Sequence, residues 1–222
     1  MAEKYGVVPK KFTKEWWPYF WMYYKWHTIA AAFVLICVGV TIQQCATSPK
    51  YDLTATYVGT SGFSEETQNS VSEYIAQYTA DIDRNGKSLP FFQQLVITEN
   101  NQDAQYNYAM STKLMLEFQN DCSYLFLMDS TYAENMLKPG SSYDGSFVPV
   151  SEWASDGVET DRLYPAEGTA FAVNLKDTNF AKNLNLGDRD IYIAVRCESK
   201  DDEKNKQAFD NSKEIANELI KK

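Results

Sequence analysis

Residues 28–42 form an uncharged and almost entirely apolar stretch, and eight of the eleven residues at positions 16–26 are aromatic. Fifteen residues of α-helix rise roughly 23 Å, which is short of the roughly 30 Å of a bilayer's hydrocarbon core. A span that begins near Trp21 and ends near Gln43 has the required length. Because Trp and Tyr rings favour the water–lipid boundary, the pattern predicts an interfacial aromatic segment and a transmembrane helix over residues 16–45.

The charges that precede this stretch predict its orientation. Only two acids, Glu3 and Glu15, lie there. Flanks that are rich in lysine stay on the cytoplasmic side of a membrane. We therefore expect residues 1–15 to form a cytoplasmic tail and residues 46–222 to form an extracytoplasmic domain, with the lipid bilayer as the first partner of the chain. The preceding lysines are Lys4, Lys10, Lys11, Lys14 and Lys25.

Three other interpretations of the apolar stretch remain open. A cleaved signal peptide has a short basic leader and a small-residue cleavage site, whereas this leader is long and Gln44-Cys45-Ala46 fits such a site poorly. A lipoprotein needs small residues before its modified cysteine, and Cys45 follows Gln43 and Gln44. The third interpretation is the buried helix of a soluble domain, which the aromatic block and the lysine excess disfavour.

After residue 50, the hydrophobic pattern changes repeatedly between the two-residue period of strands and the 3.6-residue period of helices. Ser64 is a favourable N-cap for the first of these helices, and Glu65 and Glu66 suit its first turn. The predicted elements are strands at 53–59, 91–97, 124–128, 170–175 and 191–195, and helices at 64–85, 103–120, 132–137 and after the Ser199–Asp202 capping box.

Strands and helices thus alternate along the exported part of the chain. The continuous apolar run at residues 124–128 suits a strand that is covered on both faces. Residues 138–169 are rich in Gly, Pro, Ser and Asp, and we expect mostly loop there, with a short element around residues 147–153. The order predicts an α/β fold, a three-layer domain with a mostly parallel sheet. The predicted inner stripe of the 103–120 helix is Ala104, Tyr108, Met115 and Phe118. The expected inner residues of the last helix are Phe209, Ile215, Ala216, Leu219 and Ile220.

The exported residues are acidic and contain no histidine. The 177 residues after position 45 hold 16 Lys and Arg against 28 Asp and Glu, a net charge of −12. Such a domain repels phosphate backbones, which disfavours nucleic acid as a partner. Because the only histidine is His27, the domain cannot build a Ser-His-Asp triad or a histidine-containing zinc site. We expect no cofactor and no enzymatic activity.

Two groups of polar residues are candidate binding sites. The loops that follow the strands form the usual ligand edge of an open α/β sheet. A second group, Asp81, Asp83 and Asn85, matches the first half of a calcium-binding loop, although Phe92 stands where the final bidentate acid belongs. The candidate residues of the strand-end loops are Thr60, Ser61, Thr98, Glu99, Asp129 and Ser130.

Residues 120–129 read Asn-Asp-Cys-Ser-Tyr-Leu-Phe-Leu-Met-Asp, a polar turn that leads into an apolar strand ending in an acid. Residues 191–196 read Ile-Tyr-Ile-Ala-Val-Arg and precede a helix that contains Ala208 and Phe209. These stretches resemble the third strand and the returning strand of type 2 extracellular solute-binding proteins. The resemblance covers residues 51–137 and 188–222, and it implies one lobe of a periplasmic-binding-like fold. The 50 residues between the two ranges are too few for a second lobe.

The resemblance bears on Cys122 and Cys197, which both lie in the exported part, where disulfides persist. In an all-parallel sheet the two cysteines would lie at opposite edges, too far apart to bridge. In the solute-binding arrangement the returning strand runs antiparallel beside the third strand, and the cysteines can be neighbours. A disulfide and two small buried thiols therefore both remain open, and the topology of the sheet decides between them.

These observations predict a single-pass membrane protein whose extracytoplasmic domain binds other proteins. A one-lobed domain cannot close around a solute between two lobes, so the resemblance implies an interaction module. We expect an accessory subunit of a transporter or of another envelope complex. A membrane-tethered solute- or peptide-binding module is the first alternative, and a carboxylate-dependent hydrolase is the second, although no carboxylate pair stands in a recognisable motif.

Overall fold

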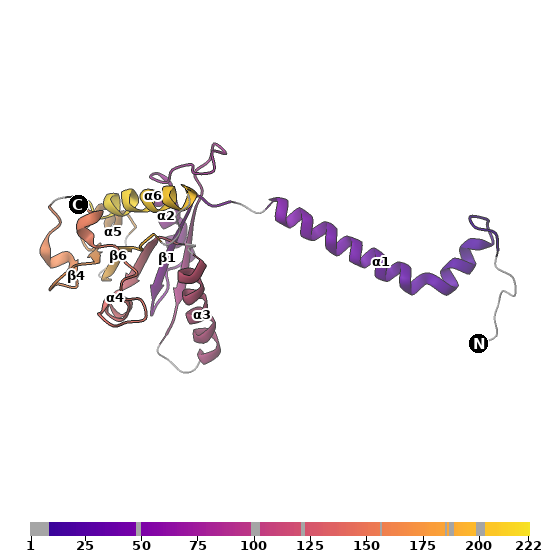
Figure 1. The fold of residues 1–222 in the computed structure, drawn as a ribbon, viewed down its shortest axis with the longest axis horizontal. Coiled ribbons are helices and arrows are strands. Elements are labelled where there is room, and N and C mark those ends of the chain that lie inside the picture. Colours follow the sequence, from indigo (N-terminus) through magenta and orange to yellow (C-terminus); the bar gives the residue numbers. More distant parts are fainter. Residues whose placement is uncertain are drawn as a thin grey trace. The chain divides into compact units, whose positions relative to one another are not determined.

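The computed structural model describes residues 9–47, 50–98, 103–120, 123–155, 157–184, 186, 189–198 and 203–222. Contacts within the chain divide it into two units, Met1–Pro49 and Lys50–Lys222. Each unit is described by itself (Figure 1).

The first unit contains one long helix, α1 (Trp16–Thr47). Within Trp16–Gln44, the most apolar 18 residues have a mean hydropathy of 1.7 and none of them is buried, so the helix is long and apolar enough to cross a bilayer, as a signal sequence also is. Pro18 lies in the first turn, where a missing N–H costs no hydrogen bond. The aromatic block and the apolar stretch therefore belong to one continuous helix.

The second unit is built on a six-stranded sheet with the strand order β2-β1-β3-β6-β5-β4. β1 pairs in parallel with β2 and β3, whereas the β3–β6, β6–β5 and β5–β4 pairs are antiparallel. The sheet is therefore mixed, and the expectation of a mostly parallel sheet is wrong for its second half. The strands are β1 (Leu53–Gly59), β2 (Pro90–Val96), β3 (Leu125–Asp129), β4 (Leu163–Tyr164), β5 (Ala172–Asn174) and β6 (Ile191–Val195).

The change of direction has a simple cause. Between β5 and β6, the described residues form only the short helix α5 (Asn179–Asn183), and the chain re-enters the sheet at the end where β5 leaves it. A parallel neighbour needs a crossover, usually through an α-helix, that returns to the opposite end of the sheet. The expected α/β fold and the positions of the main strands are confirmed.

Helices cover both faces of the sheet and make three layers (Figure 1). One face carries α2 (Glu65–Ala76), α5 and α6 (Glu203–Leu219) over the larger apolar core, which includes Tyr57, Ile75 and Leu219. The other face carries α3 (Ala104–Asn120) and α4 (Ser130–Leu137) over a second core, which includes Leu114 and Phe126. β1 and β3 contribute side chains to both cores, which explains their almost continuous apolar sequence.

Local signals predicted the beginnings of helices better than their ends. Ser64 caps α2 by accepting a hydrogen bond from the backbone N–H of Thr67, as its sequence position predicts. The same helix ends at Ala76 and not at Asn85-Gly86. The capping box at Ser199 and Asp202 lies outside the described residues. In α6, the expected inner residues Ile215, Ala216, Leu219 and Ile220 are buried, and Phe209 packs against them.

The segment expected to be mostly loop contains three short elements. They are the 3-10 turns η2 (Val150–Glu152) and η3 (Thr160–Arg162) and the strand β4. η2 falls within the short element expected around residues 147–153. β4 has only two residues, so the two-residue period that identifies a strand does not develop there.

Candidate functional site

The strand-end loops hold the first group of candidate residues, and their polar groups bond to one another. Asp129 accepts hydrogen bonds at Oδ2 from the N–H and the hydroxyl of Thr60, at 2.6 and 2.8 Å. Its Oδ1 accepts from the N–H of Tyr132 at 2.9 Å and so caps α4. Asp129, which sequence analysis proposed as a ligand-binding residue, therefore connects the loop after β1 to the start of α4.

Among the other candidate ligand-binding residues of these loops that the structure describes, two form hydrogen bonds within the protein and one is exposed. Thr98 is bonded in both directions to the side chain of Asn107 in α3, with distances of 2.6 and 3.1 Å. The backbone carbonyl of Ser61 accepts from the Tyr57 hydroxyl at 2.9 Å, and burial raises the pKa of Tyr57 to about 12, so this donor stays protonated at neutral pH. Ser130 is exposed at the first position of α4. Glu99 lies outside the described residues.

Replacing Asp129 with alanine is expected to lower the free energy of unfolding by about 2 kcal/mol, because one helix cap and two further hydrogen bonds are lost. Pulse proteolysis of the full-length protein in urea would measure this change. Asp129→Asn should cost less, because its amide oxygen still accepts one of these bonds. Asp161→Ala, at an exposed position, is the matched control and should have little effect. If Asp129→Ala leaves the free energy of unfolding unchanged, the carboxylate has no structural role and is again a candidate for ligand binding.

The second group, the predicted calcium loop, converges on a residue that sequence analysis did not single out. Ligand oxygens of Asp52, Asp81 and Asp83 lie within 4.8 Å of one another. Asp52 is buried and accepts from the N–H groups of Ile82, Asp83 and Leu89 at 2.9–3.1 Å. Its signal in the sequence is an acid placed directly before an apolar strand.

The other oxygens of this cluster also face N–H donors. Asp81 accepts from the N–H groups of Asn85 and Gly86, and Asp83 accepts from the N–H and the side-chain amide of Asn85. The Oδ1 of Asn85 accepts from the N–H of Lys87. Gly86 has a φ of 82°, which favours glycine. These bonds support a loop-ordering role for the carboxylates, and calcium binding stays a prediction.

The antiparallel β3–β6 pair is the arrangement that the predicted disulfide requires, with Leu125 opposite Val195. Cys197, two residues after β6, has no disulfide partner among the described residues, and its Sγ lies 3.6 Å from the carbonyl oxygen of Gly145. Burial, with a smaller contribution from Glu152, raises the pKa of this thiol. Cys122 lies outside the described residues, so its pairing stays a prediction.

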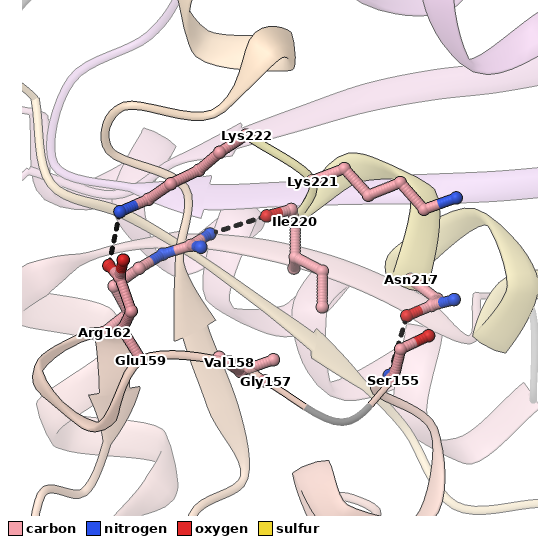
Figure 2. Close-up of a pocket in the computed structure, with 9 residues that line it drawn as sticks. All are labelled: Ser155, Gly157, Val158, Glu159, Arg162, Asn217, Ile220, Lys221 and Lys222. Carbon is pink, nitrogen blue, oxygen red and sulfur yellow. Dashed lines mark hydrogen bonds and ion pairs between the residues drawn. The ribbon is translucent and has the colours of Figure 1, made fainter.

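A hollow of about 190 Å³ lies where the loop before η3 meets the end of α6 (Figure 2). Arg162 reaches into this region and donates from Nε to the carbonyl of Asn174 and from Nη2 to the carbonyl of Ile220, at 3.0 and 2.9 Å. Glu159 and Lys222 form an ion pair beside it. No local motif in the sequence marks this place, because its residues come from segments about 60 positions apart.

The most exposed apolar side chains of the second unit lie on α3. Tyr106, Tyr108, Met115 and Leu116 are 50, 76, 54 and 46% exposed. We call Tyr108, Met115 and Leu116, which lie within about 100° of one another around the helix axis, the α3 outer face. Tyr108 and Met115 are seven residues apart and so lie on one side of the helix, two turns from each other. They belong to the stripe that sequence analysis placed inside. That prediction is wrong for Ala104, Tyr108 and Met115, which are exposed, and is confirmed for Phe118, which packs against the core.

The inner side of α3 packs against the sheet. Leu114 is buried, and the ring of Phe118 stacks on Phe126 with centroids 4.9 Å apart. At the end of the helix, the buried Arg196 donates to the carbonyls of Glu117 and Phe118 at 3.2 and 2.5 Å. The α3 outer face is therefore presented by a helix that is fixed along its opposite side.

The α3 outer face is also poor in charge. Among the 17 residues of α3, only Lys113 and Glu117 are charged, and Glu117 is buried. α6 has the same length and carries seven charged residues. Tyr and Met are enriched and charges are depleted in the centres of protein–protein interfaces. The composition of α3 therefore differs from that of an ordinary solvated helix in this acidic domain.

Comparison of the chain with protein-family models, with curated proteins and with solved structures found no match. The resemblance to solute-binding proteins stays a prediction, and the functional argument depends on the described geometry.

Proposed function

We propose that the protein is a single-pass membrane protein whose extracytoplasmic domain is a protein-interaction module, an accessory subunit of a transporter or of another envelope complex. The observation that supports this proposal is the α3 outer face, an exposed apolar surface on a fixed helix. Exposed apolar patches on soluble domains mark interaction sites more often than they mark ordinary surface. α1 supplies the attachment to the bilayer that such a subunit needs.

The charge of the domain indicates the chemistry of the partner. The exported part has a net charge of −12, while α3 itself is nearly uncharged. A second copy of the chain would bring two acidic domains together, which is electrostatically unfavourable. A partner whose apolar surface is bordered by Lys and Arg would be attracted by the same charge. The proposed occupant of the α3 outer face is therefore a different membrane or envelope protein with such a surface.

Site-specific photocrosslinking in native membranes tests this proposal. A benzoylphenylalanine at position 108 or 115 is expected to give an adduct with one heterologous protein, through a peptide that is apolar and flanked by Lys or Arg. The same residue at position 78, an exposed tyrosine outside α3, is the matched control. An adduct between two copies of the chain, or the same adducts at all three positions, would contradict the proposal.

The polar substitutions Tyr108→Gln and Met115→Gln are expected to weaken partner binding by at least about fivefold each, because central aromatic and Met contacts often contribute more than about 1 kcal/mol. Neither substitution changes the net charge. Co-purification from gently solubilised membranes would measure the loss, with Tyr78→Gln as the control that should keep binding within about twofold. Equal losses in all three variants would show that α3 has no special role.

A further inference from the structure

The lining of the hollow at the end of α6 contains more cationic than acidic side chains, in contrast to the domain around it. Its lining includes three cationic side chains and one acid. Glu159 pairs with Lys222, and Lys221 pairs with Glu218, just outside the lining. This pairing leaves Arg162 without an ion-pair partner within the described chain. The cations of the lining are Arg162, Lys221 and Lys222.

Arg162 has donor capacity beyond its two hydrogen bonds. A guanidinium carries five N–H groups, and only Nε and Nη2 donate to described acceptors, the carbonyls of Asn174 and Ile220. Nη1 has no acceptor among the residues that the structure describes. The side chain is only 9% exposed, so water has little access to it. Burial accordingly lowers the pKa of Arg162, against the longer-range effect of Glu159, Asp161 and Asp177.

The remaining lining determines what else a ligand must carry. Val158 and Ile220 supply apolar surface beside the guanidinium, and Ser155 is bonded through its N–H to the side chain of Asn217 at 2.8 Å. Figure 2 shows Val158 and Ile220 among the side chains that line the hollow. A volume of about 190 Å³ lies below the roughly 300–1,000 Å³ of pockets for drug-sized ligands. The space therefore suits a small organic group.

We propose that this hollow binds a carboxylate that bears a short branched aliphatic group, with the carboxylate on Arg162 and Lys222 and the aliphatic group against Val158 and Ile220. Arg is suited to this task because its planar fork matches the geometry of a carboxylate. A free short-chain acid and the carboxyl terminus of a peptide share this chemistry. The site is separate from the α3 outer face, because the two lie over opposite faces of the sheet.

Methyl NMR of the full-length protein in nanodiscs, with labelled Ile and Val, tests the proposal. Titration with isobutyrate is expected to shift the methyl signals of Ile220 and Val158 with millimolar saturation. Isobutyramide has the same shape and no charge, and it should leave these signals unchanged. A tripeptide ending in valine, compared with its amidated form, distinguishes a peptide carboxyl terminus from a free acid as the natural source.

Three variants locate the bound group. Arg162→Lys should weaken isobutyrate binding by at least about tenfold, since a bidentate partner is lost. Lys222→Gln should weaken it by about threefold, because that side chain is partly exposed. Lys213→Gln removes the same charge elsewhere on α6 and should have no effect. If Arg162→Lys does not fold, Val158→Trp, which fills the hollow, should abolish the shifts.

Two results would overturn the proposal. One is an equal response to isobutyrate and isobutyramide, which would show that charge plays no part. The other is binding that survives both Lys222→Gln and Val158→Trp unchanged, which would place the carboxylate elsewhere. Neither result affects crosslinking from α3, so failure of this site and failure of the interaction module can be told apart.

Discussion

Replacing Arg196 with alanine is expected to lower the free energy of unfolding by about 3 kcal/mol. The guanidinium is 5% exposed and donates to two carbonyls at the end of α3, and it also lies 5.0 Å from the ring centre of Phe118. Each bond to a charged donor contributes roughly 1.5–3 kcal/mol, and relief of the buried charge offsets part of the loss. Pulse proteolysis of the full-length protein in urea would measure the change.

The matched control is Arg189→Ala, because Arg189 is exposed and makes one described hydrogen bond, from Nη1 to the carbonyl of Gly62 at 3.2 Å. That substitution should cost less than about 1 kcal/mol. Hydrogen exchange should also show the last turn of α3 opening more often in Arg196→Ala. Equal costs for the two substitutions would contradict the view that Arg196 fastens α3 to the sheet.

Placing an arginine at the centre of the apolar stretch, as Leu35→Arg, is expected to disfavour membrane insertion by about 3 kcal/mol. A charged side chain at the middle of a span has this apparent cost, together with the loss of a favourable Leu. Gln43→Arg adds the same charge near the end of α1, where the side chain can reach the headgroups. We expect much of the Leu35→Arg protein to escape the carbonate-resistant membrane fraction and Gln43→Arg to remain there.

The mass of the purified wild-type protein supplies the complementary measurement. A retained span predicts that residues 1–45 are present in the membrane-bound protein, with a tag on Lys222 accessible from outside the cell. An exported form that lacks residues 16–45 would identify α1 as a cleaved signal sequence. Recovery of the full-length wild-type chain from the cytosol would contradict the membrane assignment itself.

Elements with a strong local pattern were predictable from the sequence. β6 is found at residues 191–195, as expected, because five consecutive apolar or aromatic residues lie between polar neighbours. The start of α2 was predictable because Ser64 and the acids after it are a local capping signal. The end of α2 was not predictable, because Tyr78 and Ile82 continue the helical spacing. In the structure, the N–H groups of Ile82 and Asp83 donate to Asp52 instead of continuing the helix. Because Asp52 is far away in sequence, local spacing does not reveal this contact.

The error in α3 has the same origin. Its sequence contains two apolar stripes at helical spacing, and only contacts with the sheet decide which one faces inward. Phe126 and Arg196 select the side that carries Leu114 and Phe118, so Tyr108 and Met115 are left exposed. The hollow at Arg162 could not be predicted from the sequence either, because its lining joins residues near η3 to residues at the end of α6. A surplus of apolar residues over what one helix face can bury was the only signal of the α3 outer face.

The two outer strands of the sheet have a consequence for contacts between molecules. β2 begins at Pro90, and β4 has two residues and is followed by Pro165. Proline cannot donate to a neighbouring strand, and a two-residue border offers very little backbone for pairing. Neighbouring molecules therefore find little backbone to pair with along β4 and lose the first pairing position along β2, which reduces the joining of sheets between copies of the chain.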